Sequence, residues 1–217
     1  MSTQTQTSTL YLAQARAAAN SQDCMALYDK WAATYNDEVG DAAQEYVAPV
    51  LVAQFALKTS NDIAQKVILD AGCGTGLVGQ ALGLAGAKTI DGLDLSRPML
   101  KVAEKTGVYR NLDQADMTRQ IEKPDDTYDI VTCVGTFTAG HVGPDPALRE
   151  LVRITRKKGL VVATILEEIW VSGGFKAEVE KLNAEGLVKL AAEELIDYVK
   201  GHGDKAVLVV LEKTDRA

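Results

Sequence analysis

Three glycines alternate with other residues directly after an apolar run, in the stretch VILDAGCGTG at residues 67–76. An acid, Asp70, stands before them. Glycine has no Cβ and adopts backbone conformations that other residues avoid, so Gly72, Gly74 and Gly76 let a bound molecule approach the main chain closely. The stretch therefore predicts a tight turn that carries a ligand and begins with a carboxylate.

Strands and helices alternate from Lys66 onward, and this order decides where the turn lies. The expected strands include residues 66–71, 88–95, 128–134, 159–166, 187–198 and 206–213. In an open α/β sheet, ligands bind beyond the carboxyl ends of the parallel strands. Asp94 lies at the end of the second of these strands, 18 residues after Gly76, where a carboxylate can accept hydrogen bonds from both hydroxyls of a ribose. We therefore expect a nucleotide-like cofactor, although a tight turn with an incidental acid would give the same pattern.

The last two expected strands are joined by only a few residues, around 200–204. A parallel connection needs a crossover of about a dozen residues or more, so these strands should form an antiparallel hairpin at one edge. The fold class is therefore α/β, with a mostly parallel sheet that contains one reversed strand.

Two kinds of cofactor compete for the glycine turn. Gly74 to Gly79 matches the dinucleotide pattern G-x-G-x-x-G, which is a weak signal by itself. Against a dinucleotide, Asp70 would face a pyrophosphate, the chain has little room for a substrate domain, and no Tyr-x-x-x-Lys pair is present. The order D-x-G-x-G-x-G suits a cofactor without phosphates, whose amino-acid ammonium group the Asp70 carboxylate could engage directly or through water.

The chain resembles the class I S-adenosylmethionine-dependent methyltransferases over roughly residues 60–213. The matching stretches are DAGCGTG (70–76), GLDLSRPML (92–100), ADMT (115–118), YDIVTCVGTF (128–137) and LVRITRKKGLVVATI (151–165). This resemblance implies a three-layer sandwich with a seven-stranded sheet, the last strand antiparallel, and S-adenosylmethionine as cofactor. The cofactor-binding residues that it implies are Asp70, Gly72, Gly74, Gly76, Asp94, Leu95, Asp116 and Met117. In this family, Asp116 would bond the adenine amino group and Met117 would border the adenine ring.

A narrower resemblance links LYDKWAATYND (27–37) and GTFTAGHV (135–142) to the small methyltransferase-like proteins of the Williams–Beuren region. It implies that Tyr28, Trp31 and Tyr35 lie on a helical lid over the cofactor. Their spacing places them on one helical face, which core packing explains equally well. The expected organisation is one methyltransferase domain, with a disordered tail at 1–9, a helical lid at 10–60 and a Rossmann-like core at 61–217.

Composition limits the partners. The net charge is −7, and binding to nucleic acid requires a basic face, so we expect no nucleic-acid partner. No apolar run approaches the ~20 residues of a membrane span. The three cysteines form neither an even set nor a C-x-x-C pair, which suggests no metal site and fits a reducing, cytoplasmic location.

His141 is the candidate catalytic residue. It follows the strand at 128–134 in the stretch TFTAGHVGPD, at the edge where an acceptor should bind, and the ordinary histidine pKa of ~6.5 suits a general base. A structural role or a contact with the cofactor remains the alternative. We therefore expect in-line transfer of a methyl group to a small-molecule acceptor, with a protein acceptor still open. The alternatives are a fold relative that binds the cofactor for another reaction and a non-catalytic cofactor-binding subunit.

Overall fold

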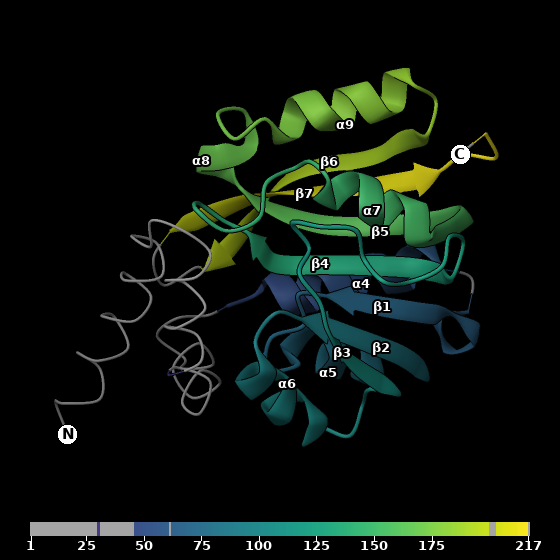
Figure 1. The fold of residues 1–217 in the computed structure, drawn as a ribbon, viewed down its shortest axis with the longest axis vertical. Helices are drawn as coiled ribbons and strands as arrows, with labels where there is room; N and C mark the ends of the chain where they lie inside the picture. The colour runs from purple at the N-terminus through teal and green to yellow at the C-terminus, as the bar shows by residue number, and fades with distance from the viewer. Residues whose placement is uncertain (1–29, 31–45, 61, 200–202, 217) are drawn as a thin grey trace, which may run out of the picture.

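The computed structural model describes residues 30, 46–60, 62–199 and 203–216. Within these residues seven strands form one sheet in the order β3-β2-β1-β4-β5-β7-β6 (Figure 1). The strands are β1 (Val67–Ala71), β2 (Thr89–Asp94), β3 (Asn111–Gln114), β4 (Tyr128–Phe137), β5 (Thr155–Leu166), β6 (Val188–Val199) and β7 (Asp204–Lys213).

Strand directions confirm the reversed strand. β1 pairs in parallel with β2 and with β4, and the β2–β3 and β4–β5 pairs are parallel as well. β7 runs antiparallel to both β5 and β6. The six strands β1 to β6 therefore point the same way, and their carboxyl ends meet at one edge of the sheet, called the carboxyl edge below.

Helices cover both faces of the sheet. They are α4 (Ala48–Thr59), α5 (Leu77–Leu84), α6 (Arg97–Glu104), α7 (Ala147–Ile154), α8 (Glu167–Trp170) and α9 (Phe175–Ala184), with a short 3-10 helix, η1 (Ile63–Gln65). Successive strand residues point to opposite faces, so Ile68 packs in one core with α4 and α5, and Leu69 packs in the other with α7 and α9. Figure 1 shows α7 in front of the sheet, α4 behind it, and α9 alongside β6. The three-layer α/β prediction is thus confirmed.

Helix α4 belongs to the segment that the sequence assigned to a lid. Its Ala48, Val52 and Ala56 are fully buried in the core beside α5. This helix therefore forms part of the layer behind the sheet. Tyr28, Trp31 and Tyr35 lie outside the described residues, and their place over the cofactor stays a prediction.

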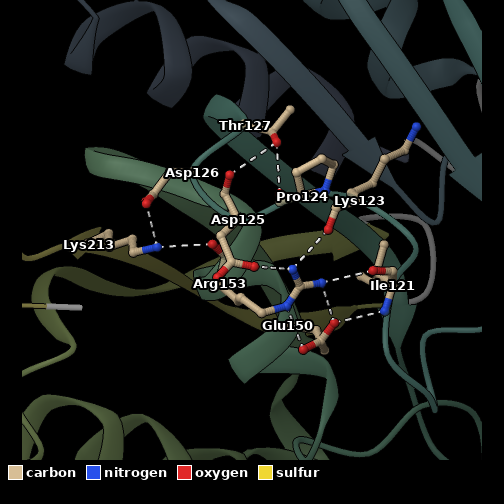
Figure 2. A network of polar contacts seen from close by, with 9 residues as sticks. All are labelled: Ile121, Lys123, Pro124, Asp125, Asp126, Thr127, Glu150, Arg153 and Lys213. Atoms are coloured by element: carbon tan, nitrogen blue, oxygen red, sulfur yellow. Dashed lines mark hydrogen bonds and ion pairs between the residues drawn. The ribbon is translucent and has the colours of Figure 1, made fainter.

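A network of charges ties together the amino edge, the end of the sheet opposite the carboxyl edge (Figure 2). Arg153, at the end of α7, bonds the carboxylates of Glu150 and Asp125 and the backbone carbonyls of Ile121 and Lys123. The network continues through the buried ammonium of Lys213, which donates to Asp126 Oδ1 and to the Arg153 carbonyl oxygen. These contacts join the loop before β4 to α7 and β7.

No helix in the described ranges is both long and apolar enough to cross a lipid bilayer.

Candidate cofactor and acceptor site

The glycine turn lies at the carboxyl edge, between β1 and α5. All three predicted glycines have positive φ, +73° at Gly72, +52° at Gly74 and +96° at Gly76. The backbone N–H groups of Gly72 and Cys73 both donate to the Leu93 carbonyl oxygen, at 2.8 and 2.9 Å. The turn is thus fastened to the neighbouring strand β2, and left-handed backbone at these positions favours glycine.

The glycines of the turn face different surroundings. A Cβ on Gly72 would lie 2.0 Å from Thr136 Oγ1 of β4, so glycine is needed there for close packing. A Cβ on Gly74 would meet no atom within 4 Å, because this position opens toward empty space. Gly76 faces the opposite way, toward Tyr109 and Thr106. Gly74 is therefore the position at which a ligand can approach the bare main chain.

Asp94 ends β2 beside the turn. Its Oδ2 accepts a hydrogen bond from the Gly74 N–H and its Oδ1 accepts one from the Ser96 N–H, both at 2.8 Å. Ser96 in turn caps α6, since its hydroxyl accepts from the Met99 N–H. A carboxylate offers about four acceptor sites, so Asp94 is held in place while it retains the capacity to accept ligand hydroxyls.

One cavity opens above the turn and brings most of the predicted site residues together. Its empty space amounts to about 1040 Å³, and this figure includes space that is open to solvent. The predicted residues on its wall are Gly72, Gly74, Asp94, Leu95, Asp116, Met117 and His141. Among the described residues that line it there are two carboxylates, Asp94 and Asp116, and no lysine or arginine. Such a wall suits a cationic ligand better than a pyrophosphate.

Asp116 and Met117 lie in the loop after β3. The Asp116 Oδ1 accepts from the Thr118 N–H at 2.9 Å and from the Thr118 hydroxyl at 2.7 Å. Met117 is buried and borders the same cavity. The pair thus forms one wall with an anchored carboxylate next to an apolar side chain, a combination that fits an adenine ring and its amino group.

The structure places Asp70 differently from the sequence-based expectation of a contact with the cofactor. Its side chain is fully buried and lies outside the cavity wall, and its Oδ2 accepts a hydrogen bond from the Tyr109 hydroxyl at 2.7 Å. The Thr132 hydroxyl donates to Oδ1 at 3.2 Å. Burial raises the pKa of Asp70 to about 6, although these two hydrogen bonds lower it. The Asp70 carboxylate bonds Tyr109, and a Cβ on Gly76 would point toward Tyr109 as well. Both residues therefore support the turn from the side away from the cavity.

Other residues border the cavity where β4 ends. Gly135 has a φ of +81°, and a Cβ on it would lie 3.0 Å from the Tyr46 hydroxyl. That hydroxyl donates to the Tyr198 hydroxyl at 3.2 Å. Tyr46 lies some 90 residues from Gly135 along the chain, so no local sequence pattern indicates this contact. A glycine next to the end of a buried strand was the only available sign of such a close approach.

His141 lines the same region. Its Nδ1 is hydrogen-bonded to the hydroxyl of Thr138, three residues earlier in the loop. The backbone N–H of His141 donates to the Thr138 carbonyl oxygen at 3.2 Å, so a tight turn fixes the pair. Burial lowers the pKa of His141 below its ordinary value, which keeps the imidazole neutral near pH 7.

Comparisons with known proteins agree with this geometry. Residues 68–159 match the model of a methyltransferase domain family. The chain is 30% identical to the ubiquinone biosynthesis O-methyltransferase of Aliivibrio fischeri over 166 residues, covering 74% of this chain and 68% of that protein. The chain belongs to the class I S-adenosylmethionine-dependent methyltransferases. It is also 34% identical to human methyltransferase-like protein 27 over 63% of this chain, a match that spans only 55% of the human protein.

Solved structures share the fold. A TehB-like S-adenosylmethionine-dependent methyltransferase from Corynebacterium glutamicum superposes with a TM-score of 0.64 at 24% identity, over 87% of this chain and 99% of that one. The [4+2]-cyclase SpnF gives a TM-score of 0.70 at 18% identity, over 91% and 97%. The enzyme is thus a methyltransferase with S-adenosylmethionine as cofactor. Three features fit that cofactor: the open space at Gly74, the anchored Asp94 carboxylate, and a described cavity wall with two carboxylates and no lysine or arginine.

Proposed function

We propose that this methyltransferase methylates a hydroxyl group of a small molecule. The observation that carries the proposal is a cavity whose wall includes Tyr46, Thr136 and His141 as well as the glycine turn and Asp94. The cofactor and a small acceptor can therefore share one continuous cavity. Similarity to ubiquinone biosynthesis O-methyltransferases supports an oxygen atom as the nucleophile.

The residues around the bound acceptor have two tasks. The bound cofactor supplies a methyl group on a sulfonium sulfur, which keeps the electron pair of the broken C–S bond while the acceptor oxygen forms the new C–O bond. The walls orient the acceptor and exclude water, and such alignment can lower a barrier by about 7–11 kcal/mol. In the tautomer whose Nδ1–H donates to Thr138 Oγ1, Nε2 carries the lone pair, and His141 takes the hydroxyl proton there.

Neutral His141 is suited to this proton transfer. Its lowered pKa keeps the base form populated at physiological pH, and a positioned general base contributes about 10²–10⁴-fold to the rate. Replacing His141 with Ala should therefore lower kcat by about 10²–10⁴-fold and leave the affinity for S-adenosylhomocysteine within about twofold. In the wild type, kcat/KM should fall on the acid side as His141 becomes protonated, and this limb should be absent in the variant.

The experiment uses methyl-labelled S-adenosylmethionine with a panel of phenols and catechols, and calorimetric titration of both proteins with S-adenosylhomocysteine. Transfer of label to a small hydroxyl compound supports the proposal. Label that enters only proteins of a cell extract would identify a protein acceptor, and cofactor binding without any transfer would indicate a different reaction or a non-catalytic subunit. Loss of cofactor affinity in His141→Ala would make the histidine a cofactor contact.

A further inference from the structure

Tyr109, in the segment between α6 and β3, occupies a hollow made by three glycines. A Cβ on Gly79 would lie 2.3 Å from the Tyr109 hydroxyl oxygen, and a Cβ on Gly92 would lie 3.0 Å from its ring. A Cβ on Gly76 would approach the other side of the ring to 3.1 Å. These glycines belong to α5, to β2 and to the end of the turn, so the ring packs against two neighbouring elements and the cofactor turn itself.

The hydroxyl at the end of this ring bonds the buried acid that starts the turn. Tyr109 donates to Asp70 Oδ2 at 2.7 Å, while Thr132 of β4 donates to Oδ1. Asp70 has no exposure to solvent. A buried carboxylate without a cation needs such donors, because an unsatisfied polar group in the interior costs free energy.

We propose that Tyr109 is a positioning residue for the cofactor: its ring fills the hollow beneath the turn and its hydroxyl holds Asp70, so that Gly72 and Gly74 keep the conformation that receives the ligand. Tyr109 itself lies outside the cavity wall. It acts on binding only through the turn and Asp70.

The charged and titratable groups that face Asp70 are few. The pKa of Asp70 is raised to about 6: burial and, less strongly, the negative charge of Asp94 raise it, and the hydrogen bonds from Tyr109 and Thr132 lower it. Cys73 and Cys133 are further titratable neighbours, and burial with the charges of Asp70 and Asp94 raises the pKa of both thiols. Loss of the Tyr109 hydroxyl would thus raise the pKa of Asp70 above 6. The cofactor carries an ammonium group, so it should bind more tightly when Asp70 is ionised.

Tyr109→Phe is the first test, because it removes one oxygen and keeps the ring. Its matched control is Tyr128→Phe, since Tyr128 likewise donates to a buried carboxylate, Asp91 Oδ2, at 3.2 Å and away from the cavity. Calorimetric titration with S-adenosylhomocysteine should give about tenfold weaker binding for Tyr109→Phe and a change within about twofold for Tyr128→Phe. Repeated from pH 5 to pH 8, the affinity should begin to fall at a higher pH in Tyr109→Phe than in the wild type or the control.

A second test uses the space that the ring occupies. Gly79→Ala should displace the ring and weaken binding, whereas Gly83→Ala, in the same helix, places its Cβ at an ordinary 3.5 Å from Val108 and should leave binding unchanged. In a Tyr109→Ala background the methyl group at position 79 enters vacated space. The added loss from Gly79→Ala should therefore be much smaller there than in the wild type.

The outcomes separate the explanations. Unchanged S-adenosylhomocysteine affinity and an unchanged pH profile in Tyr109→Phe would overturn the positioning role. Equal losses of affinity in Tyr109→Phe and Tyr128→Phe would do so too. So would a loss from Gly79→Ala that is as large in the Tyr109→Ala background as in the wild type. The proposal concerns cofactor binding alone, so it is independent of which acceptor is methylated. Wild-type protein that binds S-adenosylhomocysteine but methylates no small hydroxyl compound would contradict only the proposed function.

Discussion

Asp70 and Asp91 lie on neighbouring strands, β1 and β2, and both are buried carboxylates that accept a hydrogen bond from a tyrosine. Their other partners differ. Asp91 accepts from the guanidinium of Arg110 at 2.9 and 2.6 Å and from the Asn111 amide at 3.0 Å. Burial alone would raise the pKa of Asp91, but these hydrogen bonds and the Arg110 charge lower it below its usual value. Asp70 has only neutral donors, and its pKa is raised.

The difference follows the position of each group relative to the cavity. Away from the cavity, a cation neutralises the buried Asp91, and Arg153 neutralises the partly buried Glu150. Both contacts fix neighbouring elements to one another. Beneath the cofactor turn the negative charge of Asp70 is left without a cation partner among its hydrogen bonds. An aspartate therefore stabilises the fold at position 91. At position 70 it keeps a negative potential beneath a site for a cationic ligand.

The largest effect on stability is expected from Arg153→Ala at the amino edge. The substitution leaves Glu150 without its guanidinium partner, and also removes donors from the Ile121 and Lys123 carbonyl oxygens. A hydrogen bond to a charged group contributes about 1.5–3 kcal/mol, so losing several of them together at this partly buried site should cost about 3–5 kcal/mol. Urea unfolding should report this loss, while S-adenosylhomocysteine affinity of the folded protein should stay within about twofold. A clear loss of affinity would contradict the separation between the two regions.

Much of this architecture was predictable from local sequence. The apolar runs marked the strands, and the short connection around residues 200–204 required the antiparallel hairpin that β6 and β7 form. The glycine turn and Asp94 were also found, since a positive φ and a carboxylate at a strand end leave direct sequence signals.

The support beneath the turn was harder to predict, because it joins residues that are distant in sequence. Gly79 inside a helix and Gly92 inside a strand are both unfavourable locally, which signals a close approach by another group. Nothing in the spacing identifies Tyr109 as that group. The direction of Asp70 was likewise decided by tertiary packing, since the hydroxyls of Tyr109 and Thr132 provide its hydrogen bonds.

Asp70→Asn tests the pH dependence on the cavity side. The pKa of Asp70 is about 6 in the folded protein and ~3.9 in the unfolded chain, so the folded state binds more protons between these values. Wild-type stability attributable to this group is therefore present below pH 4 and is lost as the pH rises to 6, by about 3 kcal/mol. The stability of Asp70→Asn relative to wild type should rise by that amount from pH 4 to pH 7. Urea unfolding at both pH values measures it, and a constant difference would mean that Asp70 is not perturbed.

Asp91→Asn should show the opposite sign with a smaller amplitude. The folded-state pKa of Asp91 is lowered, so its contribution to stability is present above the unfolded value of ~3.9 and is lost as the pH falls through the folded one. At pH 7 the variant should lose about 2 kcal/mol, the size of a hydrogen bond to a charged group, and the loss should shrink in acid. The same urea series, with Asp70→Asn alongside, compares the two slopes directly. Slopes of the same sign would imply that Arg110 does not stabilise the ionised form of Asp91. The two buried carboxylates would then affect stability in the same direction despite their different partners.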